Sequence, residues 1–326
     1  MMEQIVPESI AYSGQPPWHG VGTPVEGAMT AKEAIQHAKL DWEVLLYPCF
    51  IGDTPCKDGE SEYSIVMDDR FVLARDYDQR VYNIVSSRYR PIQNYECFEF
   101  FDSVVQSDAA KYHTVGSLRG GAVVWLLAKL NGVVEVKMEQ VDKYLLLTNS
   151  HNGSYALQMF FTPIRVYCWN TLTTAHEGKV RESTFYSRHT QGIQNRVEAA
   201  QEVLDLSSKY YTDWEQEAKW MGDEHFMEYD WPRFLKVAFG YKEDAEEIHP
   251  PTQRAMDRVQ ELVTVGAAMD NPDIRGTKWA AYNALAEYVD HEKVGKGGSD
   301  DARLASAWFG AGSEIKKKGW KWLLDN

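Results

Sequence analysis

The chain has 326 residues, of which 44% are hydrophobic and 25% are charged. This composition is that of a globular protein and differs from that of a disordered chain, so we expect one large core or two moderate ones. The formal net charge of −14 argues against broad non-specific attraction to nucleic acid, which requires an excess of Lys and Arg. This negative net charge is compatible with a local basic groove.

No stretch of about 20 apolar residues predicts a membrane helix, and the amino terminus lacks the basic and apolar regions of a secretion signal. We therefore expect a cytoplasmic protein with no membrane partner. The four cysteines form no C-x-x-C pair, which predicts buried free thiols rather than a zinc knuckle or a disulfide framework. They are Cys49, Cys56, Cys97 and Cys168.

Residues 1–190 are predicted to form a β-rich core with an N-terminal arm and one inserted helix. Prolines and glycines between Pro16 and Pro24 predict an irregular arm, and Thr30-Ala-Lys-Glu33 is a capping box that begins a helix. A helix is also expected between about Tyr95 and Gln106, where apolar residues recur at helical spacing. β-branched and aromatic runs predict strands at Glu43–Ile51, Arg70–Arg75, Val81–Ser86, Ala122–Leu130, Val133–Met138, Tyr144–Thr148, Ala156–Phe161, Arg165–Cys168 and Ser183–Arg188.

Residues 191–326 are predicted to form a helical region. From Ile193 the apolar residues follow helical spacing to about Trp220, which predicts one long helix. The sequence as a whole therefore predicts an α+β fold with a mainly antiparallel sheet in the first part and a helical C-terminal part. Further helices are expected at Trp231–Phe239, Thr252–Ala268, Lys278–His291 and Asp301–Phe309.

Several motifs resemble those of the phage and plasmid proteins grouped as domain-of-unknown-function family 932. The likeness extends over nearly the whole chain and implies that the protein comes from a mobile element. The family has no established activity, so the likeness implies no chemistry. The motifs are Trp18-His-Gly-Val-Gly22, Tyr89 to Phe101, Gly116-Ser-Leu-Arg-Gly-Gly121, His151-Asn-Gly-Ser154, Arg165 to Leu172, Arg188-His-Thr190 and Gly276-Thr-Lys-Trp279.

One candidate binding segment combines the turn at His151-Asn152 with the strand that returns from it. There, Arg165 is suited to pair with a phosphate, and Asn170 to hydrogen-bond a base or the nucleic-acid backbone. The alternative is a turn closed by Asn152-Gly153, with Arg165 and Asn170 satisfying buried strand ends.

Two further segments offer a cation beside flexible or unpaired backbone. Arg119 and Gly120 lie in a glycine-rich stretch, which either approaches a polyanion or forms a simple hairpin turn. Arg188 and His189 lie just before the long helix, whose free N–H groups favour an anion, although helix capping alone would explain Thr190. We expect Arg119, Arg165 and Arg188 to lie on one face.

The sequence contains no recognisable catalytic motif. Its histidines lack the spacing of a metal site, and phosphate-loop, nucleophile-elbow, dinucleotide and kinase signatures are absent. We therefore expect no metal, no cofactor and no catalytic residue. Near the end of the chain, Lys316 to Lys318 with Trp320 and Trp322 either holds single-stranded nucleic acid or, as we favour, forms a helix that docks on the body or on a second subunit.

These observations favour a non-enzymatic protein that binds or anneals single-stranded DNA in phage recombination, acting as a homo-oligomer. The likeness to annealing proteins is one of fold, because strands followed by a long helix also form their core. A second hypothesis is an acidic interaction or counter-defence protein that mimics DNA, and a third is a metal-dependent hydrolase. The candidate nucleic-acid contacts are Arg119, Gly120, His151, Asn152, Arg165, Asn170, Arg188 and His189.

Overall fold

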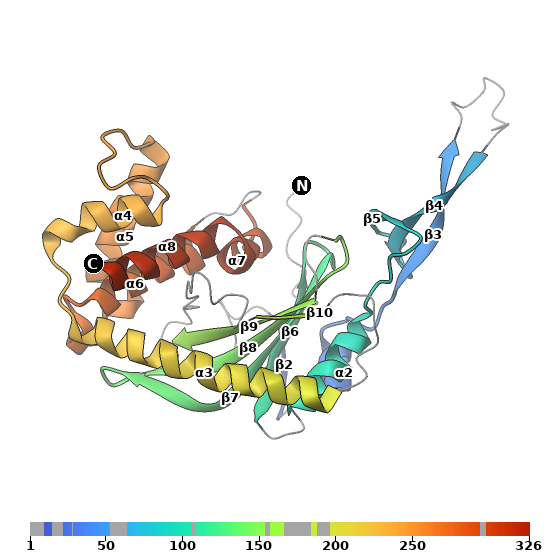
Figure 1. Cartoon of the computed structure of the whole chain (residues 1–326), viewed down its shortest axis with the longest axis horizontal. Coiled ribbons are helices and arrows are strands. Elements are labelled where there is room, and N and C mark those ends of the chain that lie inside the picture. The colour runs from blue at the N-terminus through green and yellow to red at the C-terminus, as the bar shows by residue number, and fades with distance from the viewer. Residues whose placement is uncertain are drawn as a thin grey trace.

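A computed structural model describes residues 10–14, 22–27, 29–52, 64–105, 109–153, 157–165, 184–187, 196–293 and 298–326. The fold is α+β, as predicted, with antiparallel sheets in the first part and helices in the second (Figure 1). A small sheet projects from one end of the molecule, and helices gather at the other end (Figure 1).

Within the described residues, the large sheet has seven strands in the order β10-β9-β8-β7-β6-β1-β2. Neighbouring strands are antiparallel except β1 and β2, which are parallel. The strands are β1 (Ile10–Ser13), β2 (Thr23–Val25), β6 (Ala110–Leu118), β7 (Val123–Val136), β8 (Glu139–Ser150), β9 (Leu157–Arg165) and β10 (Thr184–Ser187).

The middle of the large sheet is buried on both faces. In β7, Leu126 and Ala128 belong to one hydrophobic cluster, while Trp125 and Leu127 point into another. Successive side chains of a strand point to opposite faces, so a strand covered on both sides reads as a continuous apolar run. This explains the unbroken run of residues 122–128.

Helices from the second part of the chain cover these two faces. The long helix α3 (Arg196–Asp223) runs along one face, as Figure 1 shows, and the Tyr211 hydroxyl donates a 2.7 Å hydrogen bond to the Tyr144 carbonyl in β8. On the other face, the Trp308 ring lies 5.0 Å from the Trp125 ring, edge to face. Edge-to-face packing suits the quadrupoles of two aromatic rings.

The small sheet consists of β3 (Val44–Gly52), β4 (Ser64–Arg75) and β5 (Val81–Ser86), in that order. Two helices lie at its base: α1 (Ala31–His37) and α2 (Asn94–Val105). The predicted capping box begins α1, because the Thr30 hydroxyl accepts from the Glu33 N–H while the Glu33 carboxylate accepts from the Thr30 N–H.

The C-terminal helices enclose a second core rich in aromatic side chains. Trp214, Trp279 and Trp320 are fully buried. The indole N–H of Trp279 donates to Glu139 of β8 at 3.0 Å, which fastens the helices to the large sheet. The helices are α4 (Trp231–Ala238), α5 (Pro250–Val265), α6 (Lys278–Glu287), α7 (Asp300–Phe309) and α8 (Ala311–Asp325), with the short helices η3 (Glu228–Asp230), η4 (Ala267–Met269) and η5 (Pro272–Ile274) and the π-helix η6 (Tyr288–Glu292).

Among the described residues, no helix is both long and apolar enough to cross a membrane. One hydrophobic cluster extends from Ala11 to Leu323 and so draws on both predicted parts of the chain. The proposed boundary between residues 190 and 191 stays a prediction.

Three strands were not predicted. β1 and β2 fall in the N-terminal arm, for which no regular structure was expected, and Pro24 is tolerated in β2 because that strand lies at the edge of the sheet. β6 was missed because polar residues interrupt its apolar pattern. Two of them, His113 and Thr114, are buried and hydrogen-bonded to each other at 2.7 Å.

The hypothesis that Lys316 to Lys318 holds nucleic acid together with Trp320 and Trp322 is wrong for the two indoles. Trp320 is 0% exposed and Trp322 is 5% exposed, so neither ring can stack on a base. Lys316 is also buried, and its ammonium lies 2.7 Å from the carboxylate of Asp290. The favoured alternative, a helix docked on the body, is confirmed by α8.

Replacing Lys316 should show how strongly the buried ion pair constrains the helical core. Lys316→Met leaves the Asp290 carboxylate buried without this cation, and we expect a loss of about 3–5 kcal/mol in the free energy of unfolding. The double variant Asp290→Asn/Lys316→Met removes both charges and should recover most of that loss. Urea denaturation measures both values; equal losses in the single and double variants would contradict the prediction.

Candidate nucleic-acid interface

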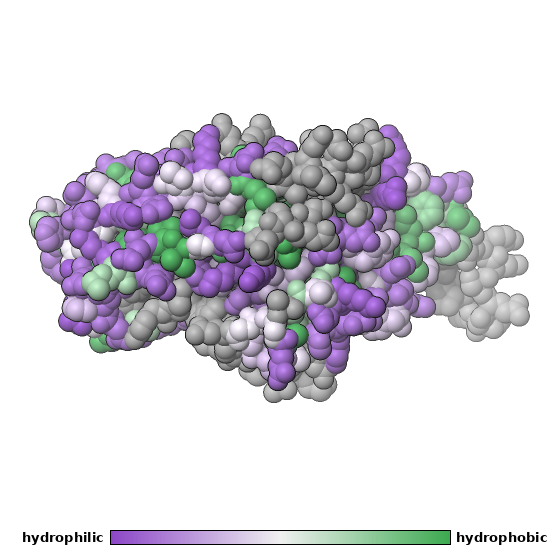
Figure 2. All heavy atoms as spheres, turned by 90° about the horizontal axis from the view of Figure 1, so that it is seen from below, coloured by the Kyte–Doolittle hydropathy of each residue, from purple (hydrophilic) through white to green (hydrophobic). Residues whose placement is uncertain are grey.

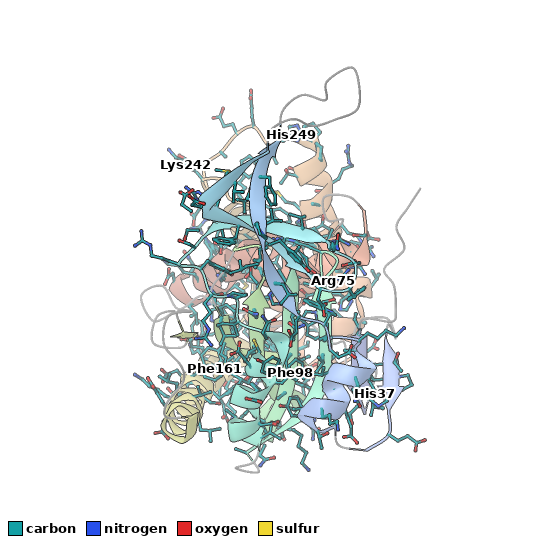
Figure 3. All side chains as sticks on the ribbon, turned by 90° about the vertical axis from the view of Figure 1, so that its right-hand side faces the viewer. His37, Arg75, Phe98, Phe161, Lys242 and His249 are labelled. Atoms are coloured by element: carbon teal, nitrogen blue, oxygen red, sulfur yellow. The ribbon has the colours of Figure 1, made fainter. Side chains whose placement is uncertain are left out.

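The candidate site lies where the small sheet meets two turns of the large sheet. One turn is Arg119–Gly121, between β6 and β7, and the other is His151–Gly153, after β8. The two turns are neighbours because the His151 N–H donates to the Ala122 carbonyl at 2.8 Å. We call these turns, together with residues 75–83 of the small sheet, the junction site. Figure 3 places Arg75 at the base of the small sheet.

The first turn depends on glycine. Gly120 and Gly121 have φ angles of +66° and +92°, a region that L side chains rarely adopt. A Cβ atom on Gly120 would lie 2.2 Å from the Arg80 guanidinium carbon, and one on Gly121 would lie 2.5 Å from the Tyr82 hydroxyl. Both glycines are therefore needed for the close approach of the small sheet.

The Arg75 guanidinium anchors the small sheet to this turn. It forms a bidentate pair with the Asp78 carboxylate, in which Arg75 Nε lies 2.8 Å from Asp78 Oδ1. A third guanidinium nitrogen of Arg75, Nη1, lies 3.5 Å from the Gly120 carbonyl oxygen. Its central carbon also lies 5.3 Å from the Trp42 ring centre and 4.5 Å from that of Tyr77. Hydrogen bonding to the guanidinium lowers the pKa of Asp78 to about 2.

His151 holds the junction together from inside. The residue is 1% exposed, and its Nε2 lies 2.9 Å from Oδ1 of Asn94. The His151 ring is stacked on Tyr82, with ring centres 5.9 Å apart, and meets Trp42 edge to face at 5.2 Å. The imidazole therefore packs inside the junction, away from solvent.

Asn152 closes the second turn. The Ser150 hydroxyl donates to the Asn152 side-chain oxygen at 2.7 Å, and Gly153 follows with a φ of +74°. The Asn152 carbonyl accepts a 2.8 Å hydrogen bond from the side chain of Asn83 in β5. A turn closed by Asn152-Gly153 was the alternative that the sequence offered to a binding role. The hydrogen bond to Asn83 shows that this turn also connects the two sheets.

The other predicted residues do not join this site or lie outside the described residues. The large-sheet register pairs Arg165 with Val141, whereas Ser150 pairs with Val123 next to the Arg119 turn. Arg165 and the Arg119 turn therefore lie at opposite ends of β8, about eight to nine strand residues or roughly 30 Å apart. Arg119 and Arg165 therefore do not form one compact site, and the expectation that Arg119, Arg165 and Arg188 lie on one face stays a prediction. Asn170, Arg188 and His189 lie outside the described residues, as does the Arg165 side chain.

The structure adds residues that sequence analysis did not select. Arg75, Asp78 and Arg80 come from the charged turn between β4 and β5, and Tyr82 and Asn83 come from β5 itself. The available signal was the charged run of residues 75–80 between two predicted strands. That run contains no motif, and only the packing of the two sheets brings it beside Gly120.

The outer surface of the junction site is charged and aromatic, with Asp76 and Asp78 exposed beside the arginines. Arg80 and Arg119 are exposed, and the nearby Tyr77 is 67% exposed. Residues 64–90 contain five Arg and four Asp, whereas residues 196–293 contain 21 Asp and Glu against 11 Lys and Arg, a formal net charge of −10. The acidic charge is thus concentrated in the helical part, at the opposite end of the molecule from the small sheet (Figure 1).

No group of three or more His, Cys, Asp or Glu side chains that could hold a metal ion occurs within the described part of the chain. The hydrolase hypothesis gains no support from these residues. The site's chemistry is that of hydrogen bonding, ion pairing and stacking.

These features define an α+β protein in which a small sheet meets a large one at a charged, aromatic junction. A family model described as a domain of unknown function (DUF932) matches residues 81–308, and the chain belongs to this family. The match begins at the first residue of β5 and ends within α7. No curated protein and no solved structure matches the chain.

Replacing Gly121 with alanine should loosen the junction. The new Cβ would lie 2.5 Å from the Tyr82 hydroxyl and 3.0 Å from Arg75 Nη1, in addition to the strain of a positive φ. Gly132→Ala is a matched control, because its φ is +80° and nothing lies within 4 Å of the new atom. We expect the control to lose about 1–2 kcal/mol of unfolding free energy and Gly121→Ala clearly more. Chemical denaturation measures both, and equal losses would argue against a close-packed junction.

The Arg75–Asp78 pair should make the junction sensitive to acid. The pKa of Asp78 is about 2 in the folded protein, below the value of 3.8 for an Asp carboxyl without these partners. The pair therefore contributes stability above about pH 4, and this stability is lost as the pH falls through about 2. Wild type should therefore be more stable than Asp78→Asn at neutral pH, and the difference should vanish near pH 2. Urea denaturation across this pH range measures the difference; a pH-independent difference would contradict the assignment.

Proposed function

We propose that the chain is a non-enzymatic protein of a phage or plasmid that binds single-stranded nucleic acid at the junction site. The observation that carries the proposal is the Arg80 guanidinium against Gly120, next to the exposed Arg119, with the exposed Tyr77 ring beside Arg75 of the same site. We further propose that it acts in the cytoplasm of the host cell as an assembly of several copies. No catalytic step is part of this proposal.

The three side chains supply the two kinds of contact that a single strand requires. Arginine presents a planar fork to phosphate, and an exposed aromatic ring can stack on any base regardless of sequence. Arg80 and Arg119 are exposed arginines of the site, and the proposal assigns the phosphate contacts to them. The Arg80 guanidinium lies over Gly120, which positions it beside the turn that carries Arg119.

The charge distribution limits how tight such binding can be. Two arginines neutralise about two phosphates, so the affinity of one site should change with salt with a log–log slope of about −1.4. The acidic helical part would repel a longer strand. Useful affinity then requires several copies on one strand, because linked sites raise the overall affinity far above that of a single site.

A role in strand annealing is the more specific form of the proposal. The antiparallel strands β7 to β10 are followed by the long helix α3, which lies across the sheet, and this order resembles that of annealing proteins. The argument is an analogy of fold, and folds are shared by proteins of different function. The proposal of single-strand binding therefore depends on the junction site, and the analogy of fold only adds strand annealing as a possible activity to assay.

The acidic helical part favours a second candidate function, that of an interaction protein whose surface imitates DNA. Its formal charge of −10 over residues 196–293 is the supporting observation. Such a protein would displace duplex DNA from a basic DNA-binding protein without binding oligonucleotides itself. A competition assay with labelled duplex distinguishes this function from the first.

Removing one junction arginine should weaken single-strand binding without unfolding the protein. Arg80→Ala and Arg119→Asn are suitable, since asparagine tolerates the φ of +55° at position 119. Each should lower oligonucleotide affinity and reduce the magnitude of the salt slope by about 0.7. Fluorescence anisotropy with single-stranded oligonucleotides at several salt concentrations measures both quantities.

The matched control is Arg254→Ala, which removes an exposed arginine from α5 in the acidic part. It should leave affinity and salt slope unchanged. The proposal fails if the wild type binds no oligonucleotide, or if the control weakens binding as much as the two junction variants do. Circular dichroism verifies that all three variants remain folded.

A further inference from the structure

The side chain of Lys293 lies in an unusual place for a lysine of the helical part. Hydrophilic residues cover most of this end of the molecule, at the left of Figure 2, and an exposed lysine there keeps its ammonium group in water. Lys293 instead follows the π-helix η6 and is partly buried. Its N–H donates to the Tyr288 carbonyl at 2.7 Å, and its side-chain nitrogen Nζ lies 3.4 Å from the Ser306 hydroxyl in α7.

The acidic side chains of η6 are bound to other cations. Asp290 pairs with the buried Lys316 at 2.7 Å, and Glu292 forms a bidentate pair with Arg258 at 2.7 Å. A lysine that is partly removed from water normally has a counter-ion, because burying an unpaired charge is costly. Within the described residues, Lys293 has only a hydroxyl at hydrogen-bond distance from Nζ.

This environment disfavours the ammonium form of Lys293. Burial lowers the pKa of the amine below its ordinary value, and no carboxylate opposes the shift. A larger fraction of the side chain is therefore a neutral amine at a given pH. Other titratable side chains on η6, on α7 and in the first turns of α8 are Tyr288, His291, Arg303, Glu314 and Lys317, and none of them alters the pKa of Lys293.

Two other lysines have a pKa lowered by burial, but a solute cannot reach them. Lys316 is 0% exposed and is paired with Asp290. Lys278 is 7% exposed, its Nζ lies 4.1 Å from the centre of the Trp220 ring, and nearby carboxylates oppose the shift of its pKa. Lys293 combines a lowered pKa with access from solvent.

Ser306 holds the amine in position. Its Oγ accepts from the Gly312 N–H at the start of α8 at 3.2 Å as well as from Nζ. Because Nζ donates to Oγ, the lone pair of the neutral amine stays available to an electrophile. The turn between α7 and α8 is closely packed, since a Cβ atom on Gly312 would lie 2.8 Å from Cγ1 of Val289 and 2.9 Å from the Ser306 carbonyl oxygen.

We propose that Lys293 is a site of acylation, at which its neutral amine takes an acyl group from a thioester or an acyl phosphate. The nitrogen attacks the acyl carbonyl carbon, an N–C bond forms, and the C–S or C–O bond breaks. The leaving thiolate or phosphate takes up the proton that the nitrogen loses. The amide product keeps one N–H for Ser306. The proposal does not depend on nucleic-acid binding.

Other electrophiles fit the surroundings of Lys293 less well. An aldehyde forms a Schiff base only after water is lost, and an acid beside the amine assists that loss. A phosphoryl group needs cations that neutralise its oxygens. Within the described residues, the neighbour of Nζ is a hydroxyl, which supplies neither. Transfer from an activated acyl donor requires only the neutral amine.

Acetyl-CoA and acetyl phosphate, each incubated separately with the full chain, test the proposal and distinguish the two kinds of donor. Peptide mass spectrometry measures the rate at each lysine, with the exposed Lys242 as the reference. At about pH 8, Lys293 should react at least about threefold faster with one donor or both. The reason is that each unit of lowered pKa raises the neutral fraction about tenfold, while nucleophilicity falls only about threefold.

Ser306→Asp tests the cause of this reactivity. It places a carboxylate beside Nζ, which should hold the ammonium form and lower the acylation rate of Lys293 to that of Lys242 or below. Ser208→Asp is the matched control, because it makes the same change on an exposed position of α3 and should leave the rate unchanged. Circular dichroism verifies that both variants are folded.

Three results would overturn the proposal. They are a Lys293 that reacts no faster than Lys242 with either donor, a folded Ser306→Asp variant that reacts like the wild type, and an acyl group found on Ser306 in place of Lys293. Oligonucleotide binding is measured in a separate assay, so its failure would leave the acylation result unaffected.

Discussion

The buried guanidinium of Arg75 connects the two sheets, and the geometry of the junction site depends on it. It is bonded to Asp78 and lies between the Trp42 and Tyr77 rings, with one nitrogen directed at the Gly120 carbonyl. A cation taken out of water must keep such partners, because an uncompensated buried charge is strongly destabilising. The small sheet is therefore held in one orientation, which places the Arg80 side chain on Gly120.

The large sheet is covered on both faces by helices from later in the chain, and polar groups fix how the two parts meet. The Tyr211 hydroxyl donates to a β8 carbonyl, and the Trp279 indole donates to Glu139 at the start of β8. Each donor is surrounded by apolar residues, so leaving it unpaired would cost about 1–3 kcal/mol. These bonds select one packing of the helices among those that hydrophobic burial alone would allow.

Charge is divided along the molecule, and this division bears on where a polyanion can approach it. The helical part carries most of the negative charge, while Arg and Asp nearly balance in the small sheet and its turns. A polyanion would therefore meet least repulsion at that end of the molecule.

Local patterns in the sequence were sufficient to predict the α+β class, the Thr30 capping box, the long helix and the glycine turn at Arg119, since periodicity, caps and glycine act over a few residues. Long-range packing decided the rest. It made His151 an internal residue of the junction, separated Arg165 from Arg119 by the length of a strand, and brought Arg80 onto Gly120. No pattern in one segment can encode these relations, because strand order and register arise only when distant segments bury their apolar faces together.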